Sequence, residues 1–195
     1  MKSFSRFLAI ALLIFLSAGQ ALAVDEVLIG DDIENGGYAG PVVKFSKIRG
    51  ETAVLWGGYG GWLINHTLLI GGGAFGLTSE IAAPITSEKL YYDLGYAGLV
   101  IEYINNSHKL LHYTVGTLIG IGSVGYDSEK SKVDYADDTI FVLEPGIGLE
   151  LNVSSSFRIN LGVSYLYIDG VKLEGTKAKD LSSATANLTF KFGAF

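Results

Sequence analysis

Residues 157–167 read FRINLGVSYLY, and this alternating stretch decides the fold. The odd-numbered positions are all apolar or aromatic, and the even-numbered positions between them begin with Arg158, Asn160, Gly162 and Ser164. A period of two is typical of a β-strand whose faces meet different surroundings, because a helix repeats about every 3.6 residues. The stretch therefore predicts a strand with one apolar and one polar face.

The same alternation recurs along the rest of the chain. It is clear at 110–124, 140–152 and 183–192, and weaker at 38–47, 52–64, 67–78 and 90–104. Together with the first stretch, these runs predict eight strands. Most of them reach about 9–11 residues or more, which is enough to cross a bilayer as a tilted strand.

Two runs contain irregular positions. Asp93 and Glu102 fall on opposite parities within 90–104, so we expect a bulge in that run. Pro145 cannot donate a backbone hydrogen bond, so we expect a bulge or distortion around 144–146.

The connections between runs alternate in length after the second run. Short links lie at 65–66, 105–107 and 154–155, and longer polar links lie at 79–89, 126–138 and 169–180. Outer-membrane barrels have short periplasmic turns and longer outer loops. The pattern therefore predicts an all-β fold, an eight-stranded antiparallel up-and-down transmembrane β-barrel, with both termini at the periplasmic end.

The first 23 of the 195 residues are typical of a secretory signal peptide. Lys2 and Arg6 precede an apolar run at 7–16, and a small-residue cleavage site follows at 21–23. The run is too short for a membrane-spanning helix of about 20 residues. We therefore expect a signal peptide at 1–23, a short leader at 24–37 and one barrel domain at 38–195.

The composition indicates which face of the barrel is apolar. Hydrophobic residues make up 49% of the chain and charged residues only 17%, and the polar faces of the runs carry mainly Gly, Ser, Thr and Asn. A soluble lipocalin-like carrier would instead need charged residues on its outer face. We predict a closed polar interior whose charges pair with one another, with Asp93 as a further candidate. The predicted interior network consists of Lys44, Glu144, Glu150, Arg158 and Lys191.

Three stretches carry a resemblance to a known family: Gly57–Gly76, Glu144–Tyr167 and Asn187–Phe195. They resemble the uncharacterised bacterial outer-membrane β-barrel proteins, small single-domain barrels with a signal peptide. The resemblance implies a place in the outer membrane and no agreed biochemical activity. The terminal Phe195 is similar to the C-terminal aromatic that the barrel-insertion machinery reads, although it is out of phase with Phe190 and Phe192.

The sequence predicts no catalytic, cofactor or metal site. Gly71-x-Gly73-x-x-Gly76 lacks the helix that a dinucleotide site requires. The acidic segments 25–34 and 127–138 lack the spacing of a Ca²⁺ loop. His112 could be oriented by Glu150, which would make it the candidate base of a lipid-modifying enzyme. An interior structural role for His112 is the simpler interpretation.

We therefore expect a non-catalytic barrel in the bacterial outer membrane with a structural or surface-interaction role. Its expected partners are membrane lipid and the insertion machinery, and we expect a monomer. Removal of residues 1–23 leaves 12 Lys and Arg against 20 Asp and Glu, which disfavours nucleic-acid binding. A lipid-modifying outer-membrane enzyme and a soluble periplasmic carrier of an apolar ligand remain the alternatives.

Overall fold

The computed structural model describes residues 34–84, 90–128 and 135–195. The predicted signal peptide and most of the leader lie outside the described residues. The described part contains eight strands and one short helix, in the following order. They are β1 (Asn35–Ile48), β2 (Glu51–Ile64), β3 (Leu68–Leu77), β4 (Leu90–Ile104), β5 (Leu111–Ser128), β6 (Tyr135–Asn152), β7 (Phe157–Asp169), α2 (Ala178–Leu181) and β8 (Ser183–Ala194).

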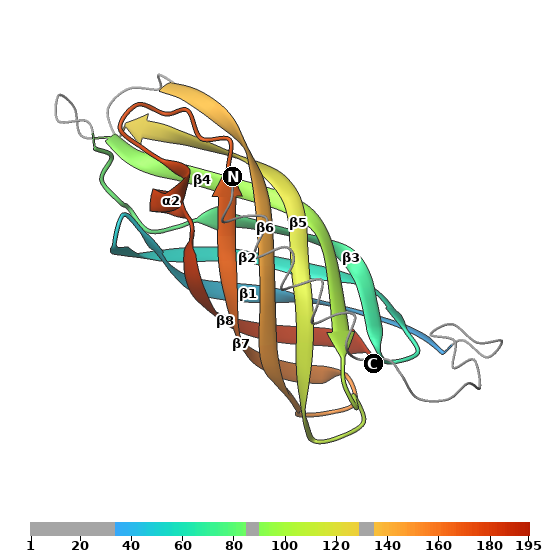
Figure 1. The fold of residues 1–195 in the computed structure, drawn as a ribbon. Helices are drawn as coiled ribbons and strands as arrows, with labels where there is room; N and C mark the ends of the chain where they lie inside the picture. The colour runs from blue at the N-terminus through green and yellow to red at the C-terminus, as the bar shows by residue number, and fades with distance from the viewer. Residues whose placement is uncertain (1–33, 85–89, 129–134) are drawn as a thin grey trace, which may run out of the picture. The chain divides into compact units, whose positions relative to one another are not determined.

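The strands form a closed antiparallel barrel in which each strand pairs with its neighbours in the sequence (Figure 1). The barrel closes where β1 pairs with β8, with Val43 opposite Leu188. The predicted fold class is confirmed. Within the described residues, no helix is long and apolar enough to cross a membrane.

The ladder irregularities differ from the predicted ones. The register of β4 with β3 and with β5 is continuous, so the predicted bulge in 90–104 is wrong. Glu102 points inward and is buried, whereas Asp93 is exposed on the outward face, three residues from the end of the strand. A polar outward residue is tolerated there because it lies near the end of the barrel. The register shift lies instead in the β5–β6 pair, between Val124 and Tyr126.

Pro145 distorts the ladder without a bulge. The β6–β7 pairing omits Glu144 and Pro145 but keeps the same register on both sides, from Leu143 opposite Tyr167 to Gly146 opposite Ser164. The missing amide hydrogen of proline accounts for a local interruption of this kind.

The outward face of the barrel is apolar on every strand. Large side chains that are at least 40% exposed occur on all eight strands: Phe45, Trp56, Ile70, Leu99, Ile121, Leu149, Leu161 and Phe192. The soluble-carrier alternative requires the opposite arrangement, with apolar side chains inside and polar ones outside. The outward apolar face is the arrangement expected for contact with lipid.

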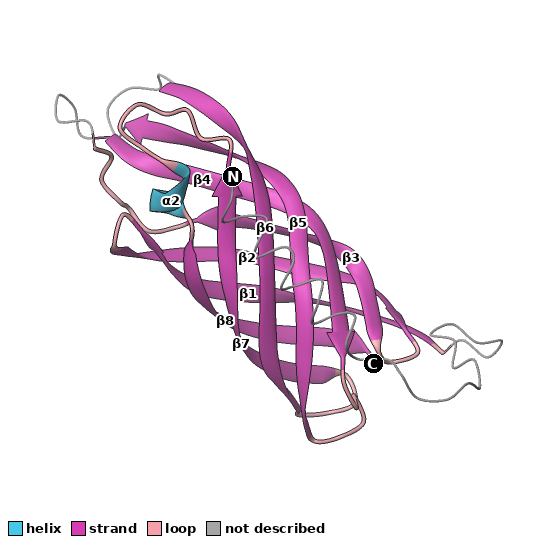
Figure 2. Ribbon diagram, viewed as in Figure 1, coloured by secondary structure: helices cyan, strands magenta, loops and turns pink. Residues whose placement is uncertain are grey.

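The connections define two ends, which we call the turn end and the loop end. The turn end carries the turns 65–67, 105–110 and 153–156 together with the C-terminus. The loop end carries 49–50, 78–84 and the β7–β8 loop (170–182), which includes α2 (Figure 2). The short β1–β2 turn binds this loop directly, since the Arg49 amide donates to the Asp180 carbonyl at 2.8 Å.

Candidate functional site

The structure places all five residues of the predicted network inside the barrel. Each occupies an inward position of its strand, and none is more than 6% exposed: Lys44, Glu144, Glu150, Arg158 and Lys191. They lie in two separate clusters, each built around one lysine. The strand period of two explains why the sequence predicted their direction, but the grouping depends on how the strands are staggered in the closed barrel.

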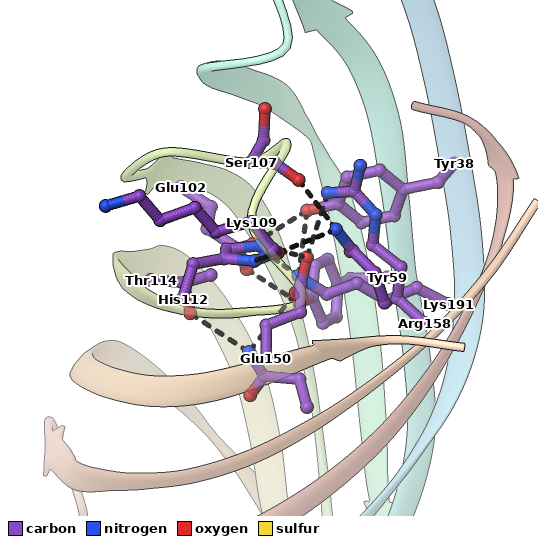
Figure 3. Close-up of polar contacts among 12 residues, drawn as sticks. Tyr38, Tyr59, Glu102, Ser107, Lys109, His112, Thr114, Glu150, Arg158 and Lys191 are labelled. Carbon is purple, nitrogen blue, oxygen red and sulfur yellow. Dashed lines mark hydrogen bonds and ion pairs between the residues drawn. The ribbon is translucent and has the colours of Figure 1, made fainter. Parts of the chain in front are cut away.

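The Lys191 cluster lies toward the turn end (Figure 3). Lys191 Nζ donates to Glu102 Oε1 and to Glu150 Oε2, both at 2.5 Å. Glu150 also accepts from Arg158 Nη1 at 3.1 Å. We define the cluster as Lys191, Glu102, Glu150, Arg158, His112, Asn160, Thr114, Tyr38 and Tyr59. The positive charges of its lysine and its arginine are balanced by the negative charges of its two glutamates.

Glu102 is the network member that sequence reasoning missed, since Asp93 was the predicted third acid. The hydroxyls of Tyr38 and Tyr59 donate to the two Glu102 oxygens at 2.8 Å and 2.7 Å. Both tyrosines were also missed. Parity alone could have suggested Glu102, because it shares the inward phase of Tyr96 and Val100 on the same strand.

His112 is part of this cluster and is only 5% exposed. Its Nε2 lies 3.1 Å from Glu150 Oε1, and its Nδ1 lies 3.0 Å from the Lys109 carbonyl oxygen. The predicted contact with Glu150 is therefore present. Both ring nitrogens are occupied by these contacts, and the ring faces the interior. Among the described residues, no group of three or more His, Asp or Glu side chains is arranged to hold a metal ion.

The Lys44 cluster lies nearer the middle of the barrel. Lys44 Nζ forms an ion pair with Glu144 Oε2 at 2.6 Å and lies 3.3 Å from the centre of the Phe75 ring. Tyr96 OH donates to the same carboxylate oxygen, and Ser164 Oγ donates to the other at 2.8 Å. Asn187 donates to Ser164. We define this cluster as Lys44, Glu144, Tyr96, Ser164, Asn187 and Phe75.

The two clusters connect strands that are distant in the sequence. Lys44 on β1 reaches Glu144 on β6, and Lys191 on β8 reaches Glu102 on β4. A buried charge is tolerated when it is paired and hydrogen-bonded, and removal of one partner is costly. The ion pairs therefore link opposite sides of the barrel through its interior.

The interior toward the loop end is apolar, which corrects the prediction of a polar interior throughout. We define the loop-end core as Leu55, Ile81, Leu94, Val142, Leu166, Ile168, Leu173 and Leu181, all buried. Ile81, Leu173 and Leu181 come from the connections and close that end. The charged network therefore occupies only part of the barrel.

At the turn end the last residue points inward. The Phe195 ring stacks on Tyr38 with centroids 5.2 Å apart, and the Arg158 guanidinium lies 3.9 Å from the Phe195 ring centre. Phe192, by contrast, faces outward and stacks on Phe157 at 4.8 Å. The phase difference noted in the sequence thus places the terminal ring against the Lys191 cluster.

Comparison with solved structures identifies the fold. The chain is similar to the crystal structure of Neisserial surface protein A, with a TM-score of 0.60 and 14% identity over 84% of this chain and 99% of that one. The N-terminal β-barrel domain of Pseudomonas aeruginosa OprF matches with a TM-score of 0.51 and 13% identity over 80% and 96%. Ail, the attachment invasion locus protein of Yersinia pestis, in complex with the heparin analogue sucrose octasulfate, matches with a TM-score of 0.50 and 13% identity over 82% and 97%.

These likenesses show that the fold is that of the small bacterial outer-membrane barrels. No family model matches the chain. No curated protein matches it either. The feature that this chain shares with the solved structures is therefore the architecture of the barrel.

Proposed function

We propose that the chain, which has the fold of the small outer-membrane barrels, is a non-catalytic barrel of the bacterial outer membrane with a structural or surface-interaction role. The observation that carries the proposal is the combination of an apolar outward face on all eight strands with buried, paired charges inside. Lipid is the partner that such an outward face requires.

The closed interior supports a role that does not involve transport. Eight strands enclose a space that side chains can fill. Here the Lys44 and Lys191 clusters occupy one part of the interior, and the loop-end core occupies the other. We propose that the network of Lys44, Glu144, Glu150, Arg158 and Lys191 keeps the interior closed.

The loop end supplies a surface that is held in a defined shape. The hydroxyl of Thr176 in the β7–β8 loop lies 2.5 Å from Tyr92 OH and 2.7 Å from Tyr126 OH. Arg49 donates to the Gly175 carbonyl at 3.1 Å. We propose that this anchored loop faces the cell exterior and contacts other molecules there. Two proteins of similar fold are described by name as a surface protein and an attachment protein, which agrees with that role.

The position of His112 supports a non-catalytic role. A base that acts on a lipid must reach the lipid, and a nucleophile must lie within hydrogen-bond reach of it. His112 is buried inside the barrel, where its ring nitrogens contact the Glu150 carboxylate and the Lys109 backbone carbonyl. We therefore assign His112 to the structural network.

The C-terminal strand fits recognition by the barrel-insertion machinery. Phe190 and Phe192 lie on the outward face of β8 next to Phe157, whereas Phe195 turns inward. We propose that the machinery binds this strand before the barrel closes, when the Phe195 ring is not yet enclosed. A monomer is the proposed state.

Membrane fractionation followed by gel electrophoresis with and without boiling tests the proposal. We expect the folded protein in the outer-membrane fraction, with a mobility in SDS that changes only on heating. Protease added to intact cells should cleave within 170–182 and spare the turns 65–67 and 105–110. Recovery of folded protein in the soluble periplasmic fraction would instead favour the carrier alternative. A lipid-modification activity lost in His112→Gln, with the heat shift retained, would favour the enzyme.

A further inference from the structure

A cavity of about 100 Å³ is lined by residues of both the Lys44 cluster and the Lys191 cluster, and the outward-facing Ile147 and Val163 also line it. Four glycines at inward positions of β5, β6 and β7 contribute to its lining. Gly116 pairs with Gly146, and Gly148 pairs with Gly162. Neither cluster fills the space that remains.

The cavity is lined by polar groups from both clusters. Glu144, Ser164 and Asn187 line it from the Lys44 cluster, and Tyr59, Glu102 and Asn160 line it from the Lys191 cluster. Val42, Val100 and Leu118 contribute apolar surface between them. The cavity thus separates two sets of hydrogen-bonding groups. Among the described residues, no hydrogen bond joins one set to the other.

Two lining residues have a buried side-chain oxygen without a hydrogen-bond partner in the described part of the protein, Thr117 and Asn187. Asn187 donates through Nδ2 to Ser164 Oγ at 2.9 Å, but its Oδ1 is buried and accepts no hydrogen bond from the described part of the protein. A buried polar atom without a partner is costly, and native proteins pair nearly all such atoms with protein or ordered water. An acceptor that lines a polar cavity therefore indicates a hydrogen-bond donor inside it.

The size and charge of the cavity determine which donor fits. A space of roughly 10–15 Å³, measured with a water-sized probe, is enough for one water, and a buried water usually makes about two to four hydrogen bonds. Each charged side chain that lines the cavity has an ion-pair partner, Lys44 with Glu144 and Glu102 with Lys191, so no uncompensated charge favours an added ion.

We propose that this cavity is a built site for ordered waters, which join the two ion clusters into one hydrogen-bonded network. One water donates to Asn187 Oδ1. The network then extends from Arg158 near the turn end to Lys44 in the middle of the barrel, and it stops at the loop-end core. The site belongs to the folded barrel itself and does not depend on the proposed surface role.

A crystal structure of the purified barrel in detergent or lipidic mesophase, at a resolution that shows waters, tests the site. We expect ordered water density in the cavity, with one peak within about 3 Å of Asn187 Oδ1. A cavity without density, or one closed by rearranged side chains, would overturn the proposal. Density for a larger or charged species would also contradict it.

Xenon pressurisation of the same crystals provides a second test, because dry apolar cavities bind xenon and hydrated polar ones do not. We expect no xenon between the clusters in the wild-type protein. The Leu166→Ala variant serves as the positive control, since it opens an apolar cavity in the loop-end core, where xenon should bind. Xenon between the clusters in the wild type would show that the cavity is dry.

A third test uses Asn187→Leu, which removes the unpaired acceptor and replaces it with an apolar side chain of similar size. We expect the water peak at this position to disappear while the remaining waters and both ion pairs persist. If all of the density persists unchanged, Asn187 is not a ligand of the site and the proposal fails. Thr189→Val changes another residue that lines the cavity and leaves the Asn187–Ser164 hydrogen bond intact, so it should leave the Asn187 water in place.

Discussion

The Lys191 cluster and the loop-end core are built on the same strands but use opposite chemistry. Along β7, the inward positions run from Arg158 and Asn160 near the turn end to Leu166 and Ile168 near the loop end. Along β4, they run from Glu102 back to Leu94. The barrel therefore combines a paired polar interior with an apolar core of the kind found in soluble proteins.

The polar and the apolar region of the interior therefore differ in why a substitution lowers the stability of the barrel. In the polar region a lost side chain leaves an uncompensated charge, whereas in the apolar region it leaves a void. The outward face adds a third situation, because lipid can fill the space that a shortened side chain vacates. Unfolding free energies measured with urea in phospholipid vesicles, with Trp56 and Trp62 as fluorescent probes, can separate these three cases.

Removal of the central lysine should have the largest effect. Lys191→Met leaves the Glu102 and Glu150 carboxylates buried without the ammonium group that now contacts both. We expect a loss of about 3–5 kcal/mol in the free energy of unfolding. The control is Lys179→Met, an exposed residue of α2, which should change it by less than about 0.5 kcal/mol. Equal effects of the two variants would show that the ion pairs do not brace the barrel.

A void in the loop-end core should cost somewhat less. Leu166 is 2% exposed, and Leu166→Ala should lower the free energy of unfolding by about 3 kcal/mol. Leu161 on the same strand is 65% exposed on the outward face and provides a matched control. We expect a clearly smaller loss for Leu161→Ala. If the control loses as much, the apolar interior is not a packed core.

Removal of both partners of a buried pair should cost less than removal of one. Lys44→Met leaves the buried Glu144 carboxylate without its ion-pair partner. Lys44→Met combined with Glu144→Gln removes both charges. We expect the double variant to regain at least about 1 kcal/mol relative to the single variant. A double variant that is less stable than Lys44→Met would indicate that hydrogen bonds, rather than charge, account for the cluster's contribution.

The terminal ring should have the smallest of these effects. Phe195→Ala removes the stacking on Tyr38 and the contact with the Arg158 guanidinium, which together are worth about 1–2 kcal/mol. The yield of barrel in the outer membrane should be measured separately from the stability of the purified protein. Unchanged stability with a reduced yield would assign Phe195 to insertion alone.

Strand positions were predictable from the sequence because they depend on local alternation. The run predicted at 90–104 is β4 (Leu90–Ile104), and the run predicted at 52–64 differs from β2 (Glu51–Ile64) by one residue. The inward direction of Lys44 and Lys191 followed from the same parity. The false bulge arose because Asp93 was treated as an interior residue, although an exposed strand end also tolerates a carboxylate.

The partners inside the barrel were not predictable in the same way. Tyr38 and Glu102 are 64 positions apart and meet only across the closed barrel. Their contact depends on the stagger of every strand between them, which no single run reveals. The loop-end core was missed for a related reason, since Leu173 and Leu181 lie in a connection and become buried only when the loop folds over the barrel.

The sequence by itself determined the strand number, the outward apolar face and the inward direction of the charged side chains, because a period of two is a local property of the chain. The tertiary structure alone decided which charges pair, where the interior turns from polar to apolar, and where a cavity remains. These features depend on barrel closure, which brings distant strands across a narrow space where every charge needs a partner.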